Sequence, residues 1–421
     1  MVYNGDAPLN YRKVHQRYGP IVRVRPNEVS VADYRMIPVI YGVGSKFTKG
    51  SVMDTMFSAR DAARHKYPKS SRNFECYADE CTQIIVDAMR DLEGRPVNFS
   101  RWLQWYAFDV IGSNTFRRRF GFMEERRDAN NMIAELDAGA QYWVLFKMGG
   151  AFQRIGVMLL PKPMDRFTKI TEEEVDRYDQ SVATAKDRRT DILAQLREKD
   201  HRLGEIFHRD MIIHLSSNLL AGSDTTAISL QAVFYYIVKN PPVYEKIQSE
   251  IDEADRKKQL SEFVTFKECL GLPYLQATMK EAMRIHPGVG FPLERYVPPE
   301  GAEICGYTLP GGTNVSISAP VIHHDREIYG PDADEFRPER WLEASSDTLK
   351  AMERYFLAFR HGPRTCIGKS ISTTQMGKFV PQILRYFRLS WASPVPEWKT
   401  DAAWLWKQSD LIVCLEIRVE A

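Results

Sequence analysis

The interpretation of this chain rests on ten residues, Phe359-Arg360-His361-Gly362-Pro363-Arg364-Thr365-Cys366-Ile367-Gly368. We expect a helix to start near Cys366, so that a thiolate there gains from the free N–H groups and the positive end of a helix dipole. Gly362 and Gly368 let the backbone approach a large flat partner. Arg364 supplies a cation for an anionic group on that partner, and Phe359 can pack against the sulfur.

The spacing Phe-x-x-Gly-x-Arg-x-Cys-x-Gly resembles the heme-ligand signature of the cytochrome P450 family. The resemblance implies a mainly α fold with small β-sheets, a triangular helical prism around a buried heme b whose iron is bound by the Cys366 thiolate. Arg360 departs from the pattern, because many members have glycine there, and it adds positive charge to the loop. The alternative is a buried structural cysteine in a glycine-rich turn.

Two more distant motifs support the resemblance. Glu281 and Arg284 lie three residues apart on one predicted helix face, a spacing that is by itself common in solvated pairs. With Arg340, in Phe336-Arg337-Pro338-Glu339-Arg340-Trp341, they resemble the Glu-Arg-Arg triad that clamps the loop leading to the heme cysteine. The resemblance gives these three residues structural and not catalytic roles.

A long apolar helix is predicted from Asp210 to Lys239, ended by Asn240-Pro241-Pro242. It contains Ala221-Gly222-Ser223-Asp224-Thr225-Thr226, whose small residues are costly within a helix unless something must come close. The segment resembles the family's oxygen-activation motif. That resemblance makes Ala221 a heme contact, Asp224 the residue that brings protons from solvent and Thr225 the hydroxyl that delivers them. A helix N-cap pair is the structural alternative.

Heme carries two propionates, so further cations are expected. Arg295 and His65 occupy positions that resemble propionate contacts, with a surface arginine as the alternative for Arg295. After His65 the family pattern breaks: members continue with paired arginines and a longer helix, whereas this chain has Lys66-Tyr67-Pro68-Lys69-Ser70-Ser71-Arg72. The stretch is short by several residues. His323 and His324 are predicted to be structural, because adjacent histidines point apart and do not easily chelate one ion.

The substrate pocket is predicted from two apolar segments that face the iron in the family. The first is Val289-Gly290-Phe291 and the second is Trp404-Leu405-Trp406 in the final hairpin. Ala221 and Thr225 complete the lining. Because these residues are apolar or small, we expect an apolar substrate; ordinary core packing is the alternative for each of them.

Composition narrows the functional classes. The net charge of +2, from 57 Lys+Arg and 55 Asp+Glu, gives no support to nucleic-acid binding. Six cysteines without a Cys-x-x-Cys pair indicate a reducing compartment and mostly buried thiols. No apolar run is long enough to span a bilayer, so we expect this chain to lack the membrane anchor with which full-length family members start.

The resemblance covers nearly the whole chain and predicts one catalytic domain over 1–421. We expect 1–60, 285–320 and the C-terminal hairpin to form its β-rich part, and 75–285 and 366–386 its helical part. Continuous helices are predicted over 80–92, 102–115 and 172–198 from apolar residues spaced three and four apart. Segment 142–164 is apolar without clear periodicity, which fits either a buried helix pair or a surface that contacts a membrane.

The predicted function is a heme-thiolate monooxygenase acting on an apolar secondary metabolite with dioxygen. Electrons come from an NADPH-dependent flavoprotein reductase, which the basic residues Arg360 and Lys369 could help to dock. Residues 281–341 resemble the filamentous-fungal, pisatin-demethylase-like group, for which the full-length protein is expected on the cytoplasmic face of the endoplasmic reticulum, as a monomer. A heme-thiolate coupling or cyclising enzyme, an isomerase or dehydratase, and a non-catalytic heme sensor are the alternatives.

Overall fold

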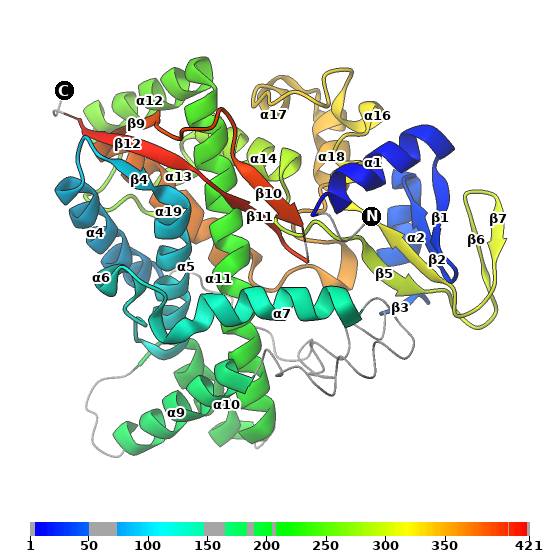
Figure 1. Cartoon of the computed structure of the whole chain (residues 1–421), viewed down its shortest axis with the longest axis horizontal. Helices are drawn as coiled ribbons and strands as arrows, with labels where there is room; N and C mark the ends of the chain where they lie inside the picture. The colour runs from blue at the N-terminus through cyan, green and yellow to red at the C-terminus, as the bar shows by residue number, and fades with distance from the viewer. Residues whose placement is uncertain are drawn as a thin grey trace. The chain divides into compact units, whose positions relative to one another are not determined.

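The computed structural model describes residues 5–49, 74–146, 165–182, 189–203, 208–402 and 404–418 (Figure 1). Their backbone is mainly helical with small β-sheets, as the sequence predicts. The chain packs into two compact units. The first holds the described residues of 1–60, 276–369 and 400–407, and the second those of 61–275, 370–399 and 408–421. The single catalytic domain over 1–421 stays a prediction.

The first unit is built on a five-stranded sheet. Its strands are, in spatial order, β1 (Ile21–Arg25), β2 (Glu28–Val31), β8 (Asn314–Ile317), β5 (Leu293–Tyr296) and β3 (Thr48–Lys49). β2 pairs with β8 in parallel, whereas the other neighbours are antiparallel. Valine and isoleucine side chains of β2 and β8 are at most 4% exposed and belong to this unit's core cluster, which explains why these short strands are rich in branched residues.

The first unit also contains short helices and two hairpins. The helices are α1 (Ala7–Tyr18), η1 (Tyr34–Met36), α2 (Ile37–Tyr41), α14 (Pro273–Ile285, from residue 276 on), α15 (Ala319–Ile322), α16 (Arg326–Tyr329), α17 (Arg340–Glu343), α18 (Ser346–Arg354) and η4 (Gly362–Arg364). The hairpins pair β6 (Ala302–Ile304) with β7 (Tyr307–Leu309), and β10 (Lys399–Ala402) with β11 (Trp406–Ser409).

The second unit is mainly helical. Its helices are α4 (Glu75–Asp91), α5 (Phe99–Phe116), α6 (Phe122–Glu125), η3 (Ala129–Asn131), α7 (Met132–Phe146), α9 (Asp165–Val182), α10 (Ile192–Leu203), α11 (His208–Lys239), α12 (Pro241–Arg256), α13 (Phe266–Cys269) and α19 (Lys369–Tyr386). A small antiparallel sheet has the order β4 (Pro96–Asn98), β12 (Ile412–Ile417), β9 (Phe387–Trp391). α11 packs along α5 and ends before the Asn-Pro-Pro sequence, as predicted.

The prediction of one helix over 172–198 is wrong, because residues 189–191 are not helical. Asp191 is fully buried and caps α10: its Oδ1 accepts a hydrogen bond from the Ala194 N–H at 3.1 Å. Arg189 pairs with Asp191 at 2.8 Å and donates to the Phe116 carbonyl of α5 at 2.6 Å. A side-chain cap of this kind starts a new helix even where the apolar periodicity continues.

Asp109 is a buried carboxylate in α5 that fixes the turn between α5 and α6. Its oxygens accept hydrogen bonds from the N–H groups of Phe120, Gly121 and Met123, at 2.8, 2.9 and 3.1 Å. Burial raises the pKa of Asp109 to about 6, although these backbone bonds act in the opposite direction. The ionised form is therefore less favourable in the folded protein than in the unfolded chain.

We expect the raised pKa of Asp109 to make stability depend on pH. A carboxyl whose folded pKa lies above its unfolded value contributes stability that is complete below the unfolded pKa and is lost as pH rises through about 6. Between pH 5 and 7.5 the loss amounts to about 1–2 kcal/mol. This loss of stability is measured from the denaturant midpoints of the parent chain and of Asp109→Asn at both pH values. The parent should lose stability relative to the variant at the higher pH, and parallel pH profiles would contradict the expectation.

Candidate functional site

The loop that precedes α19 presents Cys366 to solvent. The Cys366 N–H donates to the Phe359 carbonyl at 2.9 Å, and the Thr365 N–H donates to the Gly362 carbonyl at 3.0 Å, so the segment forms a closed turn. Cys366 is exposed, unlike Cys81 and Cys269. α19 begins at Lys369, three residues later than the start near Cys366 that the sequence predicts, because the turn's own hydrogen bonds hold 365–366 outside the helix.

The two glycines of the loop differ in what they require. Gly362 has φ of +66°, and a Cβ there would lie 1.9 Å from the Tyr41 carbonyl oxygen, so only glycine fits. At Gly368 a Cβ would lie 3.8 Å from the Cys366 Sγ, which is ordinary van der Waals contact. Contacts within the protein therefore explain why residue 362 must be glycine. They do not require glycine at position 368, where close approach by a flat partner stays a prediction.

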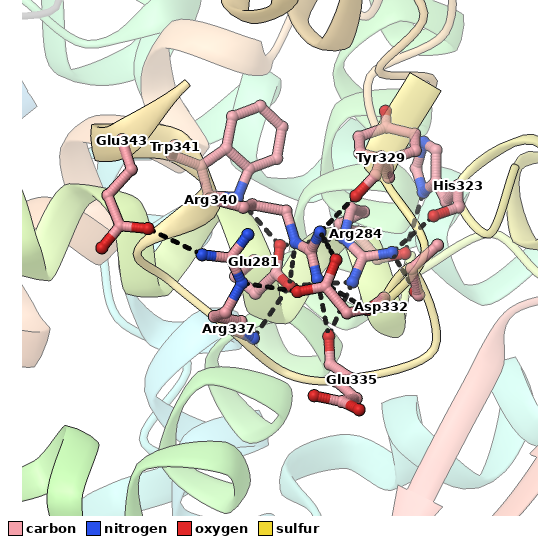
Figure 2. A network of polar contacts seen from close by, with 11 residues as sticks. Glu281, Arg284, His323, Tyr329, Asp332, Glu335, Arg337, Arg340, Trp341 and Glu343 are labelled. Atoms are coloured by element: carbon pink, nitrogen blue, oxygen red, sulfur yellow. Dashed lines mark hydrogen bonds and ion pairs between the residues drawn. The ribbon is translucent and has the colours of Figure 1, made fainter. Parts of the chain in front are cut away.

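Glu281 is fully buried and lies at the centre of a polar network in the first unit (Figure 2). Its two carboxylate oxygens accept five hydrogen bonds at 2.8–3.0 Å from Arg284 Nε and Nη2, Arg340 Nε, Trp341 Nε1 and the Arg337 N–H. Burial by itself would raise the pKa of Glu281, but the bonds and charges of Arg284 and Arg340 outweigh it and hold the pKa below its ordinary value. The network thus stabilises the ionised carboxylate.

The two arginines extend this network to backbone carbonyls. Arg284 Nη1 donates to the carbonyls of His323 and Ala333 at 2.5 and 2.7 Å. Arg340 Nη2 donates to the Asp332 carbonyl at 2.8 Å, and both guanidinium groups reach the Glu335 carbonyl. Glu281 and its two arginines therefore fix the irregular segment 332–337, and the geometry of the predicted triad is present.

His323 connects this network to the cysteine loop, a role that sequence reasoning missed. Its Nε2 accepts a hydrogen bond from the Leu357 N–H at 2.8 Å, so its Nδ1 carries the proton and donates to the Arg284 carbonyl at 2.9 Å. Burial lowers the pKa of His323 to about 3, which keeps the ring neutral. Leu357 lies two residues before Phe359, so the histidine ties the triad to the start of the loop. The prediction of a structural histidine is confirmed.

On α11 the predicted proton-relay residues occupy distinct environments. Asp224 is 2% exposed, and its Oδ1 accepts a hydrogen bond from Gln104 Nε2 of α5 at 2.7 Å. Thr225 is partly exposed, and its hydroxyl donates to the Ala221 carbonyl at 2.6 Å. Ala221 is exposed although most of α11 is buried. Gln104 is a contact of the acid that the sequence did not indicate, because nothing local marks a pairing across 120 residues.

The residues of the first unit that are predicted to supply cations lie on strand β5 and in the cysteine loop. Arg295, on β5, is 9% exposed, donates to the Glu294 carbonyl at 2.7 Å and places its Cζ 4.9 Å from the centre of the Tyr41 ring. Arg364 is exposed in η4. Phe359 is partly exposed, with Lys369 Nζ 5.6 Å from its ring centre. His65, Lys69 and Arg72 lie outside the described residues.

The predicted pocket residues of the two apolar segments meet in the first unit. Val289 forms a β-bridge with Leu405, and the rings of Phe291 and Trp404 meet edge to face at 5.9 Å. Val289, Trp404 and Leu405 are partly exposed. Gly290 and Trp406 are buried: a Cβ on Gly290 would lie 3.2 Å from the Trp406 Cβ, and Trp406 stacks on His286 at 4.1 Å. These two residues contribute core packing at this position.

The residues present fit a heme. In the first unit, the exposed thiol of Cys366 would supply a ligand to the iron, and the buried Arg295 together with the exposed Arg364 would supply cations for the two carboxylates. Among the described residues, no cluster of three or more His, Cys, Asp or Glu could hold a metal ion by itself.

The comparisons with known proteins decide the family. The cytochrome P450 family model matches residues 57–415. The chain belongs to the cytochrome P450 family. A cytochrome P450 monooxygenase of Aspergillus terreus is 35% identical over 419 residues, covering 90% of this chain and 84% of the relative. The cytochrome P450 monooxygenase gsfF of Penicillium aethiopicum is 33% identical over 454 residues, covering 99% and 90%.

A further relative, the cytochrome P450 monooxygenase cicH of Emericella nidulans, is 33% identical and covers 99% of this chain. This chain is thus a cytochrome P450 monooxygenase whose family uses a heme-thiolate centre, dioxygen, a substrate and a reductase. Within the described residues, no helix of this cytochrome P450 is long and apolar enough to cross a bilayer. Segment 147–164 of the predicted membrane-contact region lies outside those residues.

Proposed function

We propose that this cytochrome P450 hydroxylates or otherwise oxidises an apolar secondary metabolite, with Cys366 as the axial ligand of its heme. The observation that carries the assignment is the cysteine loop itself. Its thiol faces outward from a closed turn, and His323 and the Glu281 network hold the chain that leads into it. A ligand that must keep one orientation toward a metal needs a rigid support of this kind.

The heme, when bound, supplies dioxygen activation through its thiolate-ligated iron. The chain's own groups then position the substrate and move protons. Thr225, whose hydroxyl now donates to the Ala221 carbonyl, can turn to donate to an oxygen of the substrate complex, and Asp224 can replace the donated proton with one taken from solvent. Arg295 and Arg364 would bind the two heme carboxylates, and the edge-to-face pair of Phe291 and Trp404 favours an apolar, ring-containing substrate.

The cellular setting of the proposal follows the resemblance to the pisatin-demethylase-like group. An NADPH-dependent flavoprotein reductase would supply electrons to a monomeric enzyme at the cytoplasmic face of the endoplasmic reticulum, with contact to the membrane surface through 142–164. Lys369 is exposed near Cys366 and suits an acidic reductase. The sequence predicts a docking role for Arg360 as well. Its side chain is partly buried, so Arg360 does not suit that role.

An optical titration tests the substrate class. Heme-loaded protein is titrated with fractionated fungal metabolites while the Soret band is followed for the shift that accompanies loss of iron-bound water. A saturable shift confined to apolar fractions supports the proposal. Saturable shifts from polar fractions alone would contradict the apolar assignment.

Replacing Thr225 by Ala separates oxygen insertion from the alternatives. We expect product formed per NADPH consumed to fall on the order of 10²-fold, because the hydroxyl that delivers protons is lost while electron supply is not. Thr226→Ala is the matched control: that hydroxyl is buried and donates to Ser372 Oγ at 3.3 Å. Unchanged product yield in Thr225→Ala, and product that forms without dioxygen, would favour an isomerase or dehydratase instead.

A further inference from the structure

Arg360 stands in an unusual backbone conformation within the cysteine loop. Its φ is +66°, in the left-handed region that favours glycine, and its N–H donates to the Leu357 carbonyl at 2.9 Å. A residue with a Cβ is strained there, and glycine would relieve that strain. The loop therefore holds a large cationic side chain at a position whose backbone suits the smallest residue.

The Arg360 side chain turns inward. It is partly buried, and burial lowers its pKa, whereas electrostatic interactions with Cys366 and Tyr41 act in the opposite direction. Among the residues that the structure describes, no carboxylate forms an ion pair with it and no hydrogen bond of its guanidinium is found. Since arginine stays protonated in proteins, the loop that carries the thiol also carries a positive charge without a counter-ion among the described residues.

We propose that Arg360 is a positioning residue that raises the reduction potential of the heme iron by acting on Cys366. The inference rests on the proposed function, in which Cys366 is the axial ligand. A fixed positive charge beside a thiolate draws electron density toward itself, so the sulfur donates less to the iron and the ferrous state becomes more favourable. Partial burial strengthens this effect because it keeps water from screening the charge.

Two observations favour the thiolate over a heme carboxylate as the group on which Arg360 acts. The Cys366 N–H donates to the carbonyl of Phe359, the residue before Arg360, and Cys366 acts more strongly than Tyr41 on the pKa of the guanidinium. Arg295 and Arg364 already supply the cations that two carboxylates need. Arg295, a predicted carboxylate contact, places its guanidinium 4.9 Å from the centre of the Tyr41 ring, and Tyr41 also acts on the pKa of Arg360. The experiment therefore also tests the alternative that Arg360 acts on a heme carboxylate.

The experiment measures the midpoint potential of heme-loaded parent, Arg360→Lys, Arg360→Asn and Arg360→Gly. Asn tolerates the left-handed backbone without charge, and Gly removes both charge and strain, so one of them folds even if the other does not. We expect the ratio of ferrous to ferric heme at fixed ambient potential to fall about tenfold in Asn and Gly, which is about 59 mV for one electron. Lys should retain most of the parent value.

Loading the same proteins with heme dimethyl ester separates the two targets of the charge. A potential difference that persists with the ester supports action through Cys366, and one that vanishes with it assigns Arg360 to a carboxylate and overturns the proposal. Equal potentials in all four chains also overturn it. If the reduced CO complex of the parent is not of the thiolate type, the ligand assignment fails first and this inference fails with it.

Discussion

Replacing Glu281 by Gln should lower the free energy of unfolding by about 3–5 kcal/mol, the cost of removing one partner from a buried ion pair. The carboxylate accepts five hydrogen bonds and is fully buried with Arg284 and Arg340. An amide has one acceptor oxygen and no charge, so its NH₂ group would face guanidinium donors. Arg284 would lose its counter-ion, and Arg340 would keep only Asp332, whose Oδ1 lies 2.9 Å from its Nη1. Such a loss is a large part of the 5–15 kcal/mol that stabilises a typical domain.

The measurement is the denaturant midpoint of the purified chain together with its heme-to-protein ratio. Glu353→Gln is the matched control. Glu353 pairs at 2.7 Å with Lys280, which lies on the same helix as Glu281, but the Glu353 side chain is half exposed. That exposed pair should contribute less than about 1 kcal/mol. We also expect the heme-to-protein ratio to fall in Glu281→Gln, because the network supports the chain leading into the cysteine loop. Equal midpoints for the two variants would contradict the account of the triad.

Replacing Cys366 by His should abolish oxygen insertion while leaving the fold intact. Imidazole is a neutral ligand and donates less electron density than a thiolate, so O–O cleavage loses the electronic push that the family uses. Since Cys366 is exposed and the turn's hydrogen bonds come from its backbone, the substitution should change the stability of the heme-free chain by less than about 0.5 kcal/mol.

Turnover and heme stoichiometry measure this second expectation. We expect turnover below detection in Cys366→His, with heme still bound at reduced stoichiometry. Cys76→Ser is the control, because Cys76 is also exposed but lies on α4, outside the loop. Turnover retained by Cys366→His, or lost equally in the control, would contradict the assignment.

The sequence predicted those parts of the site whose residues lie close together along the chain. The Cys366 loop and the Glu281–Arg284 pair each carry a spacing that can be read directly, and the strands Ile21–Arg25 and Glu28–Val31 carry the expected branched residues. The partner of that pair, Arg340, could be named only through the family resemblance. Its contact with Glu281, at 2.8 Å across 59 residues, depends on the tertiary fold.

Features that depend on individual side-chain contacts could not be predicted. Asp191 divides the helical pattern because it caps α10 from a buried position, and burial is not visible in a periodicity. The Gln104–Asp224 and His323–Leu357 hydrogen bonds join segments that no local signal links. The inward turn of Arg360 follows from a positive φ that its residue type disfavours, so sequence reasoning placed its charge at the surface.

The reduced CO difference spectrum of the heme-loaded chain tests the central claim most directly, because its band position reports whether a thiolate ligates the iron opposite CO. The account predicts a thiolate-type band for the parent chain and its replacement by an imidazole-type band in Cys366→His. A parent spectrum of the imidazole type, or a thiolate-type band that survives in Cys366→His, would contradict the assignment of Cys366 as the axial ligand.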